Sequence, residues 1–208
     1  MVDQNRVTPY PFTYPSSQHV RRHGPTGYSD YGSYRDWLRD EFSFRCVFCL
    51  CREQWGLVRG SWHIDHFVPQ SREPESALTY DNLLYVCHTC NLSKSCHLVP
   101  DPCIVAYGQS VQVREDGTII ALNEDGQLLI DVLRLDNEDY TRTRLLLLRM
   151  VRALVTAQDH ETLVMLMGYP NNMPDLSQLR PPGNTRPEGV DNTFFARWTR
   201  GDLEDVYE

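Results

Sequence analysis

The chain reads CVFC at residues 46–49, WHIDHFVP at 62–69 and DNLLYVCHTCNLSK at 81–94. The first and last of these stretches each hold two cysteines with C-x2-C spacing: Cys46 and Cys49, then Cys87 and Cys90. Two such pairs supply the four soft thiolates of a closed tetrahedral zinc site. We therefore expect one structural zinc ion on these four cysteines. The gap between the pairs is wider than in a simple zinc ribbon. The residues inserted between them are therefore candidates for catalytic roles.

Polar residues with catalytic potential lie in this insertion and just after the second cysteine pair. They are the adjacent Asp65 and His66 with Pro69 three residues on, and then Asn82, Asn91 and Lys94. An Asp-His pair by itself is more often an ordinary surface pair, but its place between two cysteine pairs favours a catalytic role. The lysine is the single one in a chain that has 19 arginines, and this mildly favours a role for it too.

Together these residues resemble the HNH endonuclease family in its zinc-knuckle form. That pattern has a C-x2-C pair, an Asp-His with a proline three residues on, and Asn-Leu before a second C-x2-C pair. Asn or His and then Lys follow. The resemblance covers about a quarter of the chain, and its combined spacing is specific. The chain departs from many relatives at Asn91, where they have His, but Asn still offers an oxygen to a hard cation.

The resemblance implies an α+β fold with a ββα-metal (His-Me finger) core that is braced by the four-cysteine zinc site. It also implies an endonuclease that hydrolyses DNA phosphodiester bonds with a divalent ion, Mg2+ or Mn2+. Such a reaction needs an activated water and compensation of charge on the phosphate and the leaving oxygen. In this interpretation His66 is the general base, while Asp65 and Asn91 hold the ion.

The other polar residues receive supporting roles. Asn82 is expected to hold the loop after the Asp-His pair and to orient the general base. Lys94 is expected to contact phosphate or to brace the site. His63 shares a strand face with the metal-binding aspartate and is a further candidate for the cleft, or else an ordinary strand histidine. His88 and His97 are interpreted as incidental, because the zinc site already has four thiolates.

A second class of function stays open beside the nuclease: a zinc-braced module that binds nucleic acid or protein without catalysis. The intact Asp-His and Asn pattern argues against a decayed catalytic site. Family analogy favours bacterial restriction or anti-phage defence as the biological setting. The target site, the choice of DNA or RNA, the oligomeric state and the trigger are not indicated by the sequence.

Composition supports a globular protein in a reducing compartment. Of the 208 residues 41% are hydrophobic, and no run of 18 apolar residues indicates a membrane span. The proline-rich N-terminus lacks the apolar region of a signal peptide. Cysteines in knuckle spacing indicate reduced thiolates that hold metal, and hence a cytoplasmic protein. The remaining cysteines are interpreted as incidental: Cys51, Cys96 and Cys103.

The charge of the chain is uneven, with a formal net charge of -8. Residues 1–34 carry +1, residues 35–100 carry -1 and residues 101–208 carry -8. Duplex DNA is bound largely through phosphate neutralisation. We therefore expect the acidic C-terminal half to be a scaffold or a docking surface for a protein partner or a second copy. The alternative is a self-sufficient nuclease whose acidic residues all face away from the cleft. A local positive stripe could support it, through Arg142, Arg144, Arg149 and Arg152.

We divide the chain into an irregular arm (1–32), the nuclease core (33–100), a hairpin and helical extension (101–169) and a proline-rich tail with an aromatic end (170–208). The arm holds a basic cluster that we expect to be solvated, with phosphate contact as the alternative: His19, Arg21, Arg22 and His23. The aromatic end either docks on the core or meets a partner, through Phe194, Phe195 and Trp198.

Hydrophobic periodicity and turn signals predict the secondary structure. In the core we expect a helix over 34–42 with Ser33 as its N-cap, and an extended segment over 57–67 with a turn near Arg59 and Gly60. A short turn over 82–86, capped by Asp81, and a helix over 88–96 follow. Beyond the core we expect a hairpin of 111–114 with 118–122, and helices over 126–135, 140–156 and 161–167.

Overall fold

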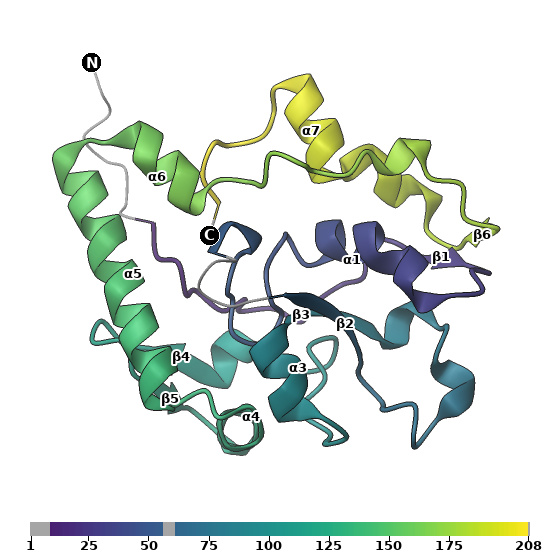
Figure 1. The fold of residues 1–208 in the computed structure, drawn as a ribbon, viewed down its shortest axis with the longest axis horizontal. Helices are drawn as coiled ribbons and strands as arrows, with labels where there is room; N and C mark the ends of the chain where they lie inside the picture. Colours follow the sequence, from purple (N-terminus) through teal and green to yellow (C-terminus); the bar gives the residue numbers. More distant parts are fainter. Residues whose placement is uncertain (1–8, 56–60, 208) are drawn as a thin grey trace.

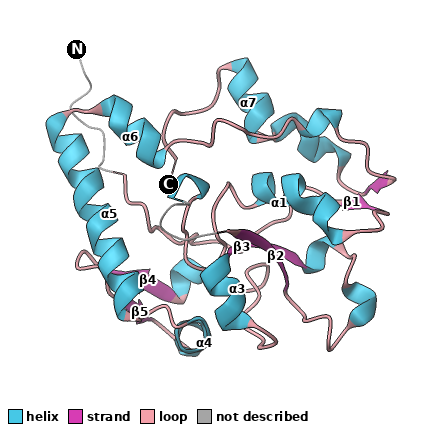
Figure 2. Ribbon diagram, viewed as in Figure 1, coloured by secondary structure: helices cyan, strands magenta, loops and turns pink. Residues whose placement is uncertain are grey.

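The computed structural model describes residues 9–55 and 61–207 (Figure 1). The predicted turn near Arg59 and Gly60 lies outside these residues. Within them, the fold consists of helices and three small antiparallel sheets of two strands each (Figure 2). The pairs are β1 (Pro25–Thr26) with β6 (Gly183–Asn184), β2 (Trp62–His66) with β3 (Leu83–Cys87), and β4 (Val111–Val113) with β5 (Ile119–Ala121).

A ββα unit of β2, β3 and α3 (His88–Lys94) forms the centre of the molecule. The register runs from Trp62 opposite Cys87 to His66 opposite Leu83. The α+β class with a ββα core is therefore confirmed. The predicted turn over 82–86 is wrong: all five residues of β3 are buried, and a short 3-10 turn, Tyr80–Asn82, precedes the strand. A continuous apolar run suits a strand that is covered on both faces.

Helix α1 (Arg35–Glu41) packs on β3 and delivers the chain to the first cysteine pair. Trp37 and Leu38 are fully buried on its inner face, as the apolar spacing predicted. Ser33 is not its N-cap, because a 3-10 turn over Tyr31–Tyr34 runs directly into the helix. The last residue of that turn is already helical at the N-cap position and needs no side-chain cap.

The predicted hairpin and helices beyond the core are confirmed to within a few residues. They are β4 with β5, α4 (Glu124–Leu133), α5 (Glu138–Ala157) and α6 (His160–Met167). An Asn or Asp side chain caps each helix by accepting from a backbone N–H in its first turn: Asn123, Asn137 and Asp159. Among the described residues, no helix combines the length and the apolar character needed to cross a bilayer.

The C-terminal tail returns to the N-terminal segment. Strand β6 pairs with β1, and the 3-10 helices Leu176–Gln178 and Pro187–Asn192 flank it (Figure 1). Helix α7 (Phe194–Arg200) follows. Phe194 docks on the core against Phe44 and Tyr169, whereas the Trp198 side chain is 60% exposed. The aromatic end therefore divides between the core and solvent.

The basic cluster of the N-terminal arm is an anchor rather than a solvated patch, so that prediction is wrong. His23 is fully buried, and its Nε2 lies 2.8 Å from the carboxylate of buried Asp40. Glu41, also buried, accepts hydrogen bonds from the backbone N–H groups of Arg22 and His23 and lies 3.0 Å from His19 Nε2. These acidic partners on α1 hold the arm against the core and leave little of the cluster for phosphate.

Glu41 makes stability depend on pH. Burial raises the pKa of this carboxyl, but the hydrogen bond with His19 and the charges of His19 and Arg21 outweigh burial and lower the pKa to about 2. Because the folded pKa is depressed, the stabilisation is complete above the unfolded value and is lost as pH falls towards 2. At pH 6 wild type should have a higher free energy of unfolding than Glu41→Gln. We expect this difference to shrink by about 1 kcal/mol between pH 6 and pH 4.

Denaturant unfolding of both proteins at each pH measures this difference, and any release of metal from the cysteines affects both equally. An advantage that stays constant over this range would show that the Glu41 carboxylate gains nothing from its partners.

Candidate functional site

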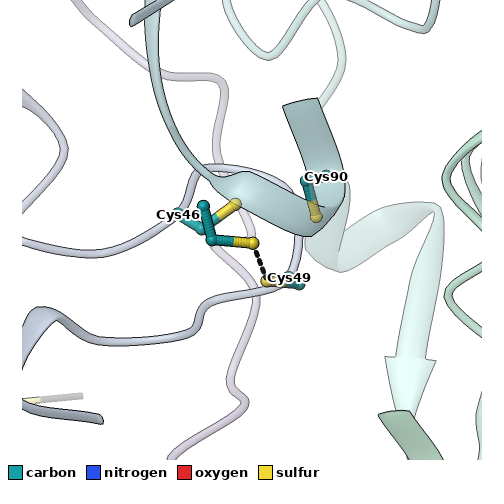
Figure 3. A group of neighbouring side chains, drawn as sticks. Cys46, Cys49 and Cys90 are labelled. Carbon is teal, nitrogen blue, oxygen red and sulfur yellow. Dashed lines mark hydrogen bonds between the residues drawn. The ribbon is translucent and has the colours of Figure 1, made fainter. Parts of the chain in front are cut away.

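The four cysteines of the two C-x2-C pairs meet at the start of α3. Their sulfur atoms all lie within 4.8 Å of one another, and all four side chains are buried. Figure 3 shows Cys46, Cys49 and Cys90 beside the first turn of α3, and its dashed line is the 3.6 Å contact between Cys49 and Cys87. A zinc ion with bonds of about 2.3 Å spaces its four sulfurs about 3.8 Å apart. The cluster therefore fits one tetrahedral zinc ion.

The thiol chemistry also suits a cation. Burial raises the pKa of the Cys46 thiol, whereas hydrogen bonds from the neighbouring thiols lower the pKa of Cys87. Several thiolates can be buried together only with a compensating cation, because a low dielectric penalises unpaired charge. No other group of three or more metal-ligating side chains occurs within residues 9–55 and 61–207. The three remaining cysteines stay outside the cluster, as predicted.

The C-terminal extension contributes one side chain to this cluster. The Tyr140 hydroxyl, on α5, lies 3.2 Å from the sulfur of Cys90. As an O–H donor it can stabilise a metal-bound thiolate, and burial beside the cysteines raises the pKa of the phenol, so the proton stays on it. The extension therefore braces the cysteine cluster directly.

Replacing Tyr140 with Phe tests this brace. We expect the free energy of unfolding of the zinc-loaded protein to fall by about 1 kcal/mol, the net value of one hydrogen bond. Urea unfolding measures it. Tyr31→Phe is the matched control, because that side chain is 41% exposed and should change stability by less than about 0.5 kcal/mol. Equal stability of the two variants would contradict the brace.

Asp65 and Lys94 form a buried ion pair between β2 and α3. The Lys94 ammonium lies 2.8 Å from the Asp65 carboxylate and also donates to the backbone carbonyl of His66, at 2.8 Å. The lysine is fully buried and the aspartate nearly so. Burial raises the pKa of the Asp65 carboxyl, and the lysine charge opposes that rise. Lys94 thus holds both residues of the Asp-His pair.

His66, the last residue of β2, has two hydrogen-bond partners at the Nε2 atom of its ring. Its Nε2 lies 3.0 Å from the carbonyl oxygen of Ala77, and since a carbonyl only accepts, Nε2 carries the hydrogen. The Nδ1 lone pair is then left to accept a proton. The Gln70 amide nitrogen also lies 3.0 Å from Nε2; because that nitrogen is a donor, this contact fits an Nε2–H ring only when the amide is turned to present its oxygen. The Tyr31 ring meets the imidazole edge to face, with centroids 5.1 Å apart.

Strand pairing continues through His66, so alternation places Asp65 and His66 on opposite faces of β2. A strand that ended at Asp65 would have released His66 from this alternation and let both side chains reach one cleft directly. Their contacts agree with the alternation, because the aspartate meets α3 and the histidine meets the loop after β2. The half-exposed ring of His66 lies at the strand end.

Asn82 fastens the loop that follows β2. Its side-chain oxygen accepts from the N–H of Val68 at 2.8 Å, and its amide nitrogen donates to the Val68 carbonyl and to the Ser76 hydroxyl. These bonds close residues 68–76 into a fixed loop. Ala77, which holds the His66 ring, comes directly after it.

The face of α3 that lies against β2 carries His88, Asn91 and Lys94, three residues apart. His88 Nδ1 lies 3.1 Å from Nε2 of His63, and Lys94 meets Asp65. Because an α-helix has about 3.6 residues per turn, Asn91 lies on the same face, between His88 and Lys94. Its half-buried side chain makes no hydrogen bond to another described residue. Its amide oxygen is therefore left for a ligand.

Comparison with known protein families decides the assignment of this unit. The family model of HNH endonucleases matches residues 46–96. This HNH segment begins at the first cysteine of the four-cysteine cluster and includes β2, β3 and α3. It contains every predicted site residue: Cys46, Cys49, His63, Asp65, His66, Asn82, Cys87, Cys90, Asn91 and Lys94. No curated protein matches the chain.

Several contacts of the HNH segment were missed by sequence reasoning. Tyr31 and Tyr140 lie outside the segment and touch His66 and the cysteine cluster. No spacing in the sequence indicates these contacts, because each depends on how distant elements pack. The contact between His63 and His88 was missed as well, although strand and helix periodicity place both residues on facing sides.

Proposed function

We propose that this protein is a metal-dependent endonuclease that hydrolyses phosphodiester bonds in DNA. One observation carries the proposal: the HNH match falls on a folded ββα unit in which the Ala77 carbonyl meets Nε2 of the His66 ring, the arrangement that leaves Nδ1 to accept a proton. A nuclease-type domain implies a nucleic acid as substrate, and the choice of DNA belongs to the proposal. Restriction or anti-phage defence is the setting we favour, by family analogy alone.

His66 is the general base in this proposal. Its Nε2–H is held by the Ala77 carbonyl, so Nδ1 can take a proton from a water molecule next to the scissile phosphate. The edge contact with Tyr31 limits rotation of the ring. Asn82 supports the same geometry from a distance, because it fixes the loop that ends at the Ala77 carbonyl.

Asp65 and Asn91 are the proposed ligands of a divalent ion, Mg2+ or Mn2+, whose oxygen-rich coordination they suit. Such an ion, when bound, compensates charge on the phosphate and the leaving oxygen. Lys94 holds the Asp65 carboxylate at 2.8 Å and keeps one of its oxygens in place. Because the lysine is fully buried, its role in this proposal is to brace the site rather than to contact phosphate.

The four cysteines hold a structural zinc ion in this proposal. It would tie the loop that contains Cys46 and Cys49 to the first turn of α3, and so set the position of Asn91 and Lys94. Thiolate ligands persist in a reducing compartment, which is the basis for proposing a cytoplasmic protein.

The deciding experiment is cleavage of supercoiled plasmid DNA by the zinc-loaded chain with added Mg2+ or Mn2+. We expect nicking that EDTA stops. We expect Asp65→Asn to lower the rate by about 100-fold or more, through loss of the ion's contribution to the transition state. The matched control is Asp125→Asn, an exposed carboxylate in the first turn of α4, which should cleave like wild type.

Cleavage of a single-stranded RNA under the same conditions, with no cleavage of DNA, would overturn the choice of substrate. If folded wild-type protein cleaved neither nucleic acid with either ion, the binding module would replace the nuclease. The intact Asp65–Lys94 pair and the anchored His66 ring support the nuclease over that alternative.

The acidic C-terminal half is the proposed docking surface for a protein partner or a second copy. One part of the alternative, a positive stripe on α5, fails: Arg144 is buried and donates to the carbonyls of Gly117 and Leu135. Arg152 lies 3.5 Å from the carboxylate of Glu115. These contacts reduce the positive charge that α5 can offer to phosphate, which supports targeting through another protein.

A further inference from the structure

Two histidines outside the zinc cluster have their ring nitrogens turned towards each other. Nε2 of His63 and Nδ1 of His88 are 3.1 Å apart, with ring centroids at 5.1 Å. The hydroxyl of Ser61 lies 3.0 Å from the same Nε2. His63 is half-exposed, and Ser61 and His88 are exposed, so the group can be reached from solvent.

Rigid backbone holds this pair in place. His63 lies within β2, and His88 is the first residue of α3. The His88 N–H donates to the carbonyl of Ser61 at 2.9 Å, and Trp62 pairs with Cys87 in the sheet. The two imidazoles therefore approach through fixed elements next to the cysteine cluster, rather than through a mobile loop.

We propose that His63 and His88 together bind a borderline divalent transition-metal ion of the nickel, copper and zinc class. Imidazole nitrogen suits this class of ion. Metal–nitrogen bonds of about 2.0–2.1 Å to atoms 3.1 Å apart give an angle of about 100° at the metal, close to tetrahedral or square geometry. The ion replaces the hydrogen bond between the two nitrogens and lies to one side of the line that joins them.

No net proton loss is required, because each neutral ring can carry its hydrogen on its other nitrogen. Water fills the remaining positions of the ion, and the Ser61 hydroxyl is placed to accept a hydrogen bond from such a water. The guanidinium of Arg35, which donates to the carbonyl of Trp62 at 3.2 Å, adds a positive charge nearby and limits the affinity. We therefore expect an exchangeable ion rather than a permanent one.

This site differs from the other two metal sites by its ligand chemistry. The cysteine cluster offers thiolate sulfur, and Asp65 with Asn91 would offer hard oxygen to Mg2+ or Mn2+. His63 and Asp65 lie on the same face of β2, two residues apart, so the histidine site borders the proposed catalytic site. Nickel, copper or excess zinc can thus bind beside the proposed catalytic site without occupying its oxygen ligands.

Isothermal titration of zinc-loaded, full-length protein without a histidine tag tests the proposal, with Ni2+ as the probe. We expect wild type to bind one Ni2+ per chain, and His63→Ala and His88→Ala each to lose this binding at least tenfold. His97→Ala, an exposed histidine just beyond α3, is the matched control and should bind Ni2+ like wild type. Zinc content and circular dichroism verify that the variants are folded.

Asp65→Asn separates this site from the oxygen site, and it should bind Ni2+ like wild type. Electron paramagnetic resonance of one added equivalent of Cu2+ should show two coupled imidazole nitrogens, and fewer in either histidine variant. No Ni2+ binding by wild type at millimolar concentration would overturn the proposal. So would binding that persists in both histidine variants, or binding that Asp65→Asn removes.

Discussion

Replacing His66 with Ala should lower the rate of DNA cleavage by roughly 10²–10⁴-fold, the usual contribution of a general base. The ring offers Nδ1 to a water molecule, while the Ala77 carbonyl fixes Nε2–H, and alanine removes both functions. The fold should survive, because the half-exposed ring contributes to the loop contacts and not to the buried core. Steady-state nicking of plasmid DNA at saturating Mg2+ measures the change.

His97→Ala provides the comparison, since it removes an exposed imidazole near the end of α3 that has no place in the mechanism. Zinc content and the thermal unfolding midpoint should match between the two variants and wild type. A folded, zinc-loaded His66→Ala protein that nicks DNA as fast as wild type would show that another group is the base.

Replacing Cys87 with Ser should abolish cooperative folding of the HNH segment. Cys87 is fully buried, is the last residue of β3 and lies 3.6 Å from the sulfur of Cys49. Structural zinc sites provide about 10–16 kcal/mol of apparent binding energy that is coupled to folding, which exceeds the stability of most domains. We expect the variant to purify without stoichiometric zinc and to lose its sharp thermal transition.

Cys96→Ser is the control, because that cysteine is exposed and is not one of the four clustered residues. It should keep one zinc per chain and change the free energy of unfolding by less than about 0.5 kcal/mol. Metal analysis that finds no zinc in wild-type protein, or full stability in Cys87→Ser, would remove the structural zinc from this account.

Much of the fold was predictable where local signals and tertiary packing agree. The apolar face of α5 and the turn between β4 and β5 are local, and both elements form within a few residues of their predicted bounds. The run over Leu83–Cys87 was misread as a turn, because its apolar residues become a strand only when β2 pairs with it and α1 covers it. Propensity alone does not decide such a short segment.

The sequence by itself indicated the HNH segment and its four-cysteine cluster. Cysteine spacing indicated the four-sulfur cluster, because two C-x2-C pairs are the usual source of the four thiolates of a tetrahedral zinc site. Tertiary structure alone decided which groups those residues touch. It buried the arm's His23 against Asp40, turned Arg144 inwards and brought His63 to His88. Each of these contacts joins separate elements. For buried His23 and Arg144 the cost of burying an unpaired polar group selects the partner, whereas His63 and His88 meet because β2 and α3 pack together.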